Sequence, residues 1–292
     1  MRIGDLINRS WDISMKYKSL WLLGLLAEGA WFGSVFRNQH SDWKFAENDL
    51  FLSGAAIALV FALLILMLVL LVLHFLSVAG LIDSVNRITR GGEYKMSLAF
   101  AAGFRVFWRY VGLWLLAAMT GIGLVAVLAI PVALFFVIGP VLGVISVIIA
   151  LPVLLAGAFV IYNIYALTQR SIVARDCSIG DALSEAYWLF RRNLGPNVAV
   201  FLVYLVLAIG ITLAAVILIL LIAAPFIAMA LSSTGGKIVA IILGLPLVLA
   251  VLLVIEGIAG VFLNSLYTLF YFGLVEPNGD VAAPPQADPS LN

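Results

Sequence analysis

The sequence predicts an all-α, polytopic membrane protein with six transmembrane helices. Of its 292 residues 64% are hydrophobic and 11% are charged, whereas about a quarter of the residues in soluble domains are charged. Uncharged runs exceed the roughly 20 residues that a helix needs to cross a bilayer, and one of them extends over residues 111–168. A chain of this composition has too little polar surface to cover a soluble core.

Charge and motif content argue against several other classes of protein. The net charge is +1, which gives no reason to expect a nucleic-acid partner. Cys177 is the single cysteine and His40 and His74 are the only histidines, so neither an internal disulfide nor a Cys/His metal site is expected. Nucleotide-binding, zinc-protease and serine-hydrolase motifs do not occur in the sequence. We therefore expect no enzyme activity and no cofactor.

A short amphipathic segment, Ser178–Leu194, is the pattern around which the chain is organised. Ser178 and Asp181 have the spacing of a helix N-cap. Polar residues, among them Ser184 and Glu185, occupy one face. The opposite, apolar face is predicted to comprise Ile179, Ala182, Leu183, Ala186, Phe190 and Leu194. Such a helix is typical of a segment that lies on a membrane surface.

Two further copies of this segment occur in the chain. Residues 1–18 contain Ile3-Gly4-Asp5-Leu6, which matches Ile179-Gly180-Asp181-Ala182. A weaker copy runs from Met96 to Tyr110. Each copy precedes a long apolar stretch, so we expect three repeats of a surface helix followed by a transmembrane hairpin.

Turn residues divide the apolar stretches into six expected spans. These spans cover approximately residues 19–36, 50–82, 109–137, 141–168, 195–231 and 238–275. The least obvious turn is placed at Gly139-Pro140, because the sequence beyond it resembles residues 244–250, which follow a visible turn at Ser232–Gly236. Pro152, Pro225 and Pro246 should kink their helices.

These spans define the expected domain organisation. Residues 1–276 form one integral membrane domain, with repeat units at about 1–92, 93–176 and 177–276. Residues 277–292 are rich in Pro, Ala, Asp and Asn and form a disordered tail.

The distribution of lysine and arginine predicts the orientation of the chain. The loops on one side contain only Arg37, Lys44 and Lys237, whereas all other basic residues belong to segments on the opposite side. Because cytoplasmic loops are enriched in Lys and Arg, both termini and the three surface helices are expected in the cytoplasm.

Four polar residues within the spans form a candidate intramembrane site: Glu256, Asn163, Asn264 and His74. An ionisable group inside a bilayer is costly and usually faces a bundle interior or a cavity. Glu256 could therefore serve a proton- or cation-linked site, or be a structural, hydrogen-bonded carboxyl group. The two asparagines are expected to bridge helices, and a packing role is favoured for His74 over metal binding.

Basic residues recur where surface helices meet spans, and they are candidate contacts of anionic lipid headgroups. This set comprises Lys16, Lys18, Arg105, Arg109, Arg191 and Arg192. The alternative is that these residues only anchor the helices by the positive-inside rule.

The repeated motif also carries a resemblance. Ile-Gly-Asp-Ala-Leu at 179–183, Ala-Tyr-Trp at 186–188 and Arg-Arg-Asn at 191–193 resemble the six-span membrane domain associated with bacterial glycerophosphodiester phosphodiesterases, and related uncharacterised bacterial integral membrane proteins. The resemblance implies a fold in the bacterial cytoplasmic (inner) membrane. It implies no reaction, because the phosphodiesterase chemistry of those proteins belongs to a separate soluble barrel.

The sequence thus favours a non-enzymatic protein of the cytoplasmic membrane, a scaffold that contacts lipid or a module that binds a protein partner. The alternative function is a permease or channel for a small solute or ion that uses the polar residues within the spans.

Overall fold

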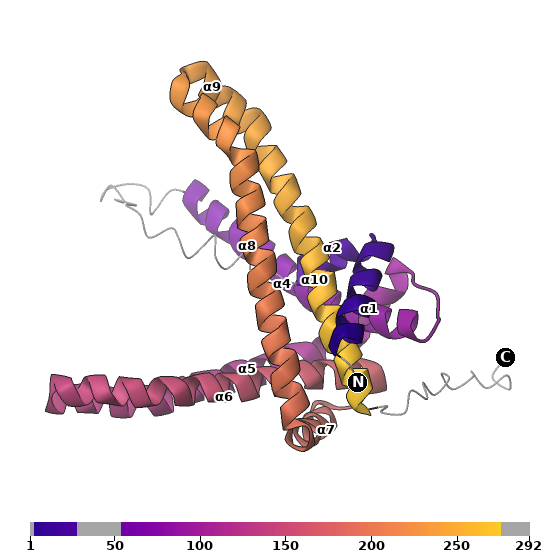
Figure 1. Cartoon of the computed structure of the whole chain (residues 1–292), viewed down its shortest axis with the longest axis vertical. Coiled ribbons are helices and arrows are strands. Elements are labelled where there is room, and N and C mark those ends of the chain that lie inside the picture. The colour runs from indigo at the N-terminus through magenta and orange to yellow at the C-terminus, as the bar shows by residue number, and fades with distance from the viewer. Residues whose placement is uncertain (1–2, 28–53, 276–292) are drawn as a thin grey trace. The chain divides into compact units, whose positions relative to one another are not determined.

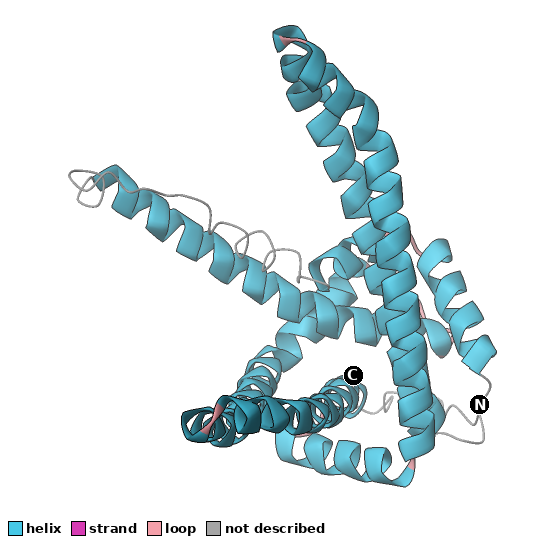
Figure 2. Ribbon diagram, turned by 60° about the vertical axis from the view of Figure 1, so that its left-hand side comes forward, coloured by secondary structure: helices cyan, strands magenta, loops and turns pink. Residues whose placement is uncertain are grey.

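The computed structural model describes residues 3–27 and 54–275, and within these ranges helices are present and strands are absent (Figure 2). The helices are α1 (Ile3–Lys16), α2 (Leu20–Ala27), α4 (Gly54–Thr89), α5 (Met96–Ile138), α6 (Pro140–Arg175), α7 (Ile179–Arg192), α8 (Leu194–Ser232), α9 (Thr234–Val239), the π-helical η1 (Ala240–Gly244) and α10 (Leu245–Val275) (Figure 1).

Five helical segments are long and apolar enough to cross a membrane, as expected for a multi-pass membrane protein. They are Val60–Thr89, Met96–Ile138, Pro140–Arg175, Leu194–Ser232 and Thr234–Val275. The first expected span, residues 19–36, is described only over α2. The rest of that span and the expected tail at 277–292 lie outside the described residues.

The turns of the two long hairpins follow the turn chemistry of the sequence. The turn predicted at Gly139-Pro140 is confirmed, since α5 ends at Ile138 and α6 begins at Pro140. Proline suits the first position of a helix, because the N–H group it lacks would have no acceptor within the helix. The second turn is shorter than the predicted Ser232–Gly236 segment. The helix resumes at Thr234, and the Ser233 side chain accepts a hydrogen bond from the Gly236 N–H at 3.0 Å.

The prolines within the spans leave the helices continuous, with one local change of helix type. Pro131 and Pro152 lie inside α5 and α6, and Pro225 lies inside α8. Pro246 instead is the second residue of α10, which begins directly after η1. A proline has no backbone N–H to donate to the carbonyl four residues earlier, and its ring crowds that carbonyl. The π-helical turn of η1 accommodates the hydrogen bond that is missing there.

The expected surface helix at 96–110 is not a separate helix. α5 runs without a break from Met96 to Ile138, through Tyr110 and into the apolar stretch. Between Tyr110 and Leu113 the sequence contains no proline, and α5 continues through Gly112, whereas α7 is bounded by Ser178 and Asn193.

The chain forms two compact units, and each is described separately. Unit 1 comprises Arg105–Leu202 and the end of α10 from Phe270, and unit 2 comprises the described residues before 105 and Val203–Leu269. The unit boundaries fall inside α5, α8 and α10, and they do not coincide with the expected repeat boundaries near residues 92 and 176.

Unit 1 is built on the antiparallel hairpin of α5 and α6, which lie side by side in Figure 1. Close to the turn, the Phe136 ring lies against Gly143, and further out Leu124 lies against Gly157. At the open end, the Tyr110 hydroxyl donates to the Gln169 carbonyl oxygen at 3.0 Å. These contacts define one register along the whole hairpin.

Unit 2 is held together by close approach of helix backbones. A Cβ atom on Gly24 of α2 would lie 2.7 Å from the Val261 backbone nitrogen of α10, and one on Gly257 would lie 2.7 Å from the Trp21 carbonyl oxygen. α4 and α5 meet similarly at Gly103, whose Cβ would lie 2.6 Å from the Leu76 carbonyl oxygen. Small residues at helix crossings are typical of membrane bundles.

Burial is unevenly distributed along the long helices of both units. Buried polar residues gather at the C-terminal ends of α4 and α6. The long apolar parts of the helices instead expose large side chains, such as Ile130 (62% exposed) and Val137 (86%) in α5. Surfaces of this kind suit contact with lipid tails, because the hydrocarbon core is as apolar as the side chains themselves.

Candidate functional site

The polar residues of unit 1 gather where α6 ends and the chain turns into α7. Asp176 caps α6 in the left-handed conformation, with φ 52°, and its N–H donates to the Ile172 carbonyl oxygen at 3.0 Å. Aspartate is one of the few residues other than glycine that adopt this conformation readily. This left-handed turn at the end of α6 therefore suits the aspartate found there.

Asp176 joins the start of α5 to the α6–α7 connection. Its Oδ1 lies 2.5 Å from Nη1 of Arg109, and its Oδ2 lies 3.6 Å from Nε of Arg105. Arg109 also donates to the Cys177 carbonyl oxygen at 3.2 Å. Because all three side chains are partly exposed, each ion pair contributes at most about 1 kcal/mol to stability.

A second polar group, the Glu185 cluster, comprises Ser171, Arg175, Glu185 and Tyr271. The Glu185 carboxylate accepts from the Ser171 hydroxyl at 2.5 Å and from the Tyr271 hydroxyl at 3.4 Å, and it lies 3.0 Å from Nη2 of Arg175. Its side chain is only 18% exposed. These contacts connect α7 with α6 and with the end of α10.

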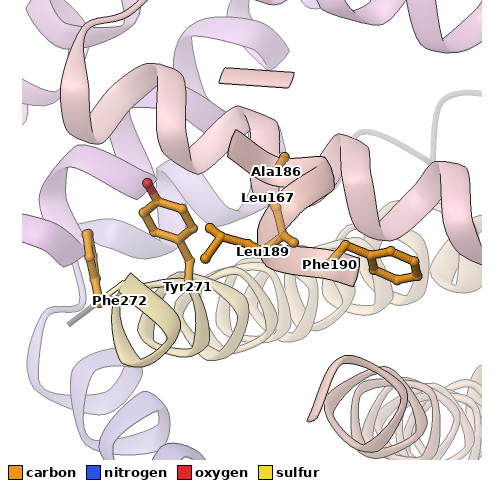
Figure 3. Close-up of a cluster of buried hydrophobic side chains, with 6 residues drawn as sticks. All are labelled: Leu167, Ala186, Leu189, Phe190, Tyr271 and Phe272. Atoms are coloured by element: carbon orange, nitrogen blue, oxygen red, sulfur yellow. The ribbon is translucent and has the colours of Figure 1, made fainter. Parts of the chain in front are cut away.

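Beside this cluster, the apolar face of α7 packs against α6 and α10. Figure 3 shows Leu167 from α6, Ala186, Leu189 and Phe190 from α7, and Tyr271 and Phe272 from α10. The predicted face is correct for Ala182, Ala186 and Phe190, which are buried. It is wrong at its end, because Leu194 begins α8 and is 50% exposed, while Leu189 takes the buried position.

The predicted cap of α7 is confirmed. The Ser178 hydroxyl oxygen accepts from the Asp181 N–H at 3.2 Å and donates to the Asp181 carboxylate at 2.6 Å. One side chain thus satisfies a free N–H of the first helical turn.

The six basic candidates for headgroup contact fall into two groups. Arg105 and Arg109 are paired with Asp176, a partner that the sequence reasoning missed. Lys16, Lys18, Arg191 and Arg192 are exposed at the ends of α1 and α7. Headgroup contact stays a prediction for all six, but Asp176 already balances one of the two positive charges of the first group.

Asn163 of the candidate intramembrane site lies in unit 1 and is fully buried. Its Nδ2 donates to the Phe159 carbonyl oxygen at 2.8 Å, within its own helix. This hydrogen bond stays within α6, and the bridging of two helices by this amide group stays a prediction. Its Oδ1 has no hydrogen-bond partner in the described part of the chain.

The other three residues of that site belong to unit 2. His74 on α4 has its Nδ1 3.1 Å from the Leu26 carbonyl oxygen of α2. A carbonyl oxygen only accepts, so this nitrogen carries the hydrogen, and the contact supports the packing role. On α10, Glu256 is half-buried and makes no hydrogen bond or ion pair with the described residues. The backbone carbonyl oxygen of Asn264 accepts from the Thr268 hydroxyl at 2.8 Å.

Within the described ranges, no group of three or more His, Cys, Asp or Glu side chains could hold a metal ion. No protein-family model, curated protein or solved structure matches the chain. The function must therefore be inferred from the geometry of the junction around α7 and from the polar residues within the spans.

Proposed function

We propose that this chain is a non-enzymatic integral membrane protein of the bacterial cytoplasmic membrane that acts as a scaffold contacting lipid headgroups. The observation that carries the proposal is the two-sided character of α7. Its buried face and Glu185 contact helices of the same chain, whereas Tyr187, Trp188, Arg191 and Arg192 are exposed. A helix fixed by its apolar face and exposing arginine and tryptophan suits a position in the headgroup layer.

The architecture that we propose has six spans in three repeats. α1 and α7 support it, because the same register positions are buried in both: Leu6, Ser10, Ile13 and Ser14 in α1 correspond to Ala182, Ala186, Leu189 and Phe190 in α7. In the weaker third copy, Ala99, Gly103 and Val106 of α5 are buried at corresponding positions. In this proposal residues 19–36 form the first span, of which the structure describes α2.

The orientation can be tested with Cys177, which lies between α6 and α7. With both termini and α7 in the cytoplasm, a membrane-impermeant maleimide leaves Cys177 unmodified in intact cells and modifies it in permeabilised cells. Protein solubilised in detergent is the control for reactivity, because the thiol is half-buried beside Ser171. Modification in intact cells would reverse the proposed orientation.

The scaffold proposal is tested by measuring transport. Purified protein reconstituted into vesicles should give no flux of protons, monovalent cations or small polar solutes above the flux of empty vesicles. A saturable flux that depends on the protein would overturn the scaffold proposal.

A permease is the second candidate, and Glu256 is the observation that favours it. This ionisable side chain lies in an apolar part of α10, between Ile255 and Gly257, without a partner among the described residues. Unpaired carboxyl groups within spans commonly belong to ion or proton pathways. If the permease exists, Glu256→Gln should abolish a flux that the wild-type protein shows, with unchanged expression. Equal flux in both proteins would exclude a role of Glu256 in transport.

A further inference from the structure

The C-terminal edge of α7 places two arginines beside two exposed aromatic rings. Tyr187 and Trp188 are 53% and 54% exposed, and Arg191 and Arg192 are exposed as well. The Arg192 guanidinium carbon lies 5.0 Å from the centre of the Trp188 ring, within the range of a cation–π contact. We call these four residues the basic edge of α7.

The acidic residues of α7 do not neutralise this edge. Asp181 is engaged with Ser178 at the first turn, and Glu185 is engaged with Ser171 and Arg175. With respect to the residues that the structure describes, Arg191 and Arg192 form no ion pair. The basic edge therefore carries two positive charges that are not balanced locally.

The basic edge also lies next to a surface that suits lipid tails. α8 begins two residues after Arg192, and within unit 1 its first turns expose Leu194 (50%), Val198 (41%) and Leu202 (52%). Exposed charged side chains at the end of α7 and exposed apolar side chains at the start of α8 therefore lie within about one helical turn of each other along the chain. In a bilayer the boundary between charged and apolar side chains corresponds to the headgroup layer, where tryptophan and arginine are enriched.

We propose that the basic edge of α7 binds the phosphate group of anionic phospholipids and prefers them to zwitterionic ones. The inference rests on the proposed function, because it requires α7 to lie at the membrane surface. The cation–π contact with Trp188 holds the Arg192 guanidinium at this edge, and its N–H groups can donate to a pair of phosphate oxygens. Arg191, one residue earlier, adds a second charge at the same level.

Arg105 and Arg109 provide a matched control, because they belong to the same unit and carry the same charge. Asp176 already pairs with both. If unpaired charge at the basic edge determines lipid preference, neutralising this pair of arginines should have a small effect. If the total positive charge of the unit determines it, the two double variants should behave alike.

The test uses the purified full chain in detergent and measures lipid binding by native mass spectrometry. Dioleoylphosphatidylglycerol is compared with dioleoylphosphatidylcholine, for the wild type, Arg191→Gln/Arg192→Gln and Arg105→Gln/Arg109→Gln. Each basic side chain contributes about 1 kcal/mol near an anionic surface, so the first double variant should lose roughly 30-fold in affinity for phosphatidylglycerol. The second should lose about threefold or less, and binding of phosphatidylcholine should be unchanged in both.

Two further measurements separate alternative explanations. Trp188→Leu should weaken phosphatidylglycerol binding while both arginines remain, because the cation–π contact that holds Arg192 is lost. Inorganic phosphate at the same concentration should not compete, since a free anion lacks the acyl chains that contact α8. Equal affinity for the two lipids, equal losses in the two double variants, or full competition by phosphate would each overturn the proposal. None of these outcomes bears on the flux test of the scaffold proposal.

Discussion

α1 and α7 share a sequence pattern and a buried register, yet they are attached to their units by different chemistry. Both helices are 14 residues long and begin with Ile-Gly-Asp. α7 uses the aromatic ring of Phe190 and the charged Glu185 cluster. At the position that corresponds to Phe190, α1 has Ser14, whose hydroxyl donates to the Ile258 carbonyl oxygen of α10 at 3.1 Å.

This difference shows that a repeated amphipathic pattern fixes which face of a helix is buried and leaves the partner open. A small hydroxyl residue permits close approach to a neighbouring backbone, whereas a large ring fills space between helices that lie further apart. α1 adds an aromatic contact of its own, since the rings of Trp11 and Phe262 meet edge to face with their centres 5.8 Å apart.

The largest expected difference between the two helices concerns corresponding buried positions. Phe190→Ala should lower the free energy of unfolding by about 3–5 kcal/mol, because it leaves a cavity in the core of unit 1. Ser14→Ala should cost about 1 kcal/mol, the contribution of one hydrogen bond. Reversible denaturation in mixed micelles measures both values. Similar costs for the two variants would mean that α1 and α7 are attached in the same way.

The second prediction concerns the charged attachment of α7. Glu185→Ala should destabilise unit 1 by about 1.5–3 kcal/mol, because Ser171 and Arg175 both lose a charged partner. The corresponding residue of α1, Arg9, is exposed, and Arg9→Ala should change stability by no more than about 0.5 kcal/mol. The same denaturation experiment separates them, and a neutral Glu185→Ala variant would contradict the role given to the Glu185 cluster.

A smaller effect is expected at the start of α7. Ser178→Ala removes the cap of the first turn and should cost about 1 kcal/mol. Ser184→Ala on the exposed face is the matched control and should be nearly neutral. Limited proteolysis of the α6–α7 connection is a sensitive measurement here, and it should accelerate for Ser178→Ala alone.

The smallest effect, with opposite sign, is expected at the two equivalent glycines. Apart from its chain neighbours and its own helix backbone, no described residue has an atom within 4 Å of a Cβ atom on Gly4. By the same measure, the Ser178 hydroxyl oxygen, at 3.9 Å, is the one described atom near a Cβ on Gly180. Gly4→Ala and Gly180→Ala should each stabilise their helix by about 0.5 kcal/mol.

Gly24→Ala is the contrasting variant, because its Cβ would collide with the α10 backbone, and it should destabilise unit 2 strongly. A stabilising Gly24→Ala variant would exclude the close approach of α2 and α10.

The sequence by itself determined the features that depend on neighbouring residues. The N-cap at Ser178, the buried positions Ala182 and Phe190, and the turn at Gly139-Pro140 follow from helical periodicity and local backbone preferences, which act over a few residues. The apolar character of the long helices also follows from composition, because a bilayer requires about 20 apolar residues for each crossing.

Only the tertiary structure decided which side chains meet. Arg109 pairs with Asp176 over a separation of 67 residues, and Tyr271 reaches Glu185 over 86. Whether a charged residue faces lipid headgroups or a partner in its own chain depends on how helices pack, and no local pattern encodes that. Periodicity identifies an apolar face, but the packed neighbours determine what that face contacts.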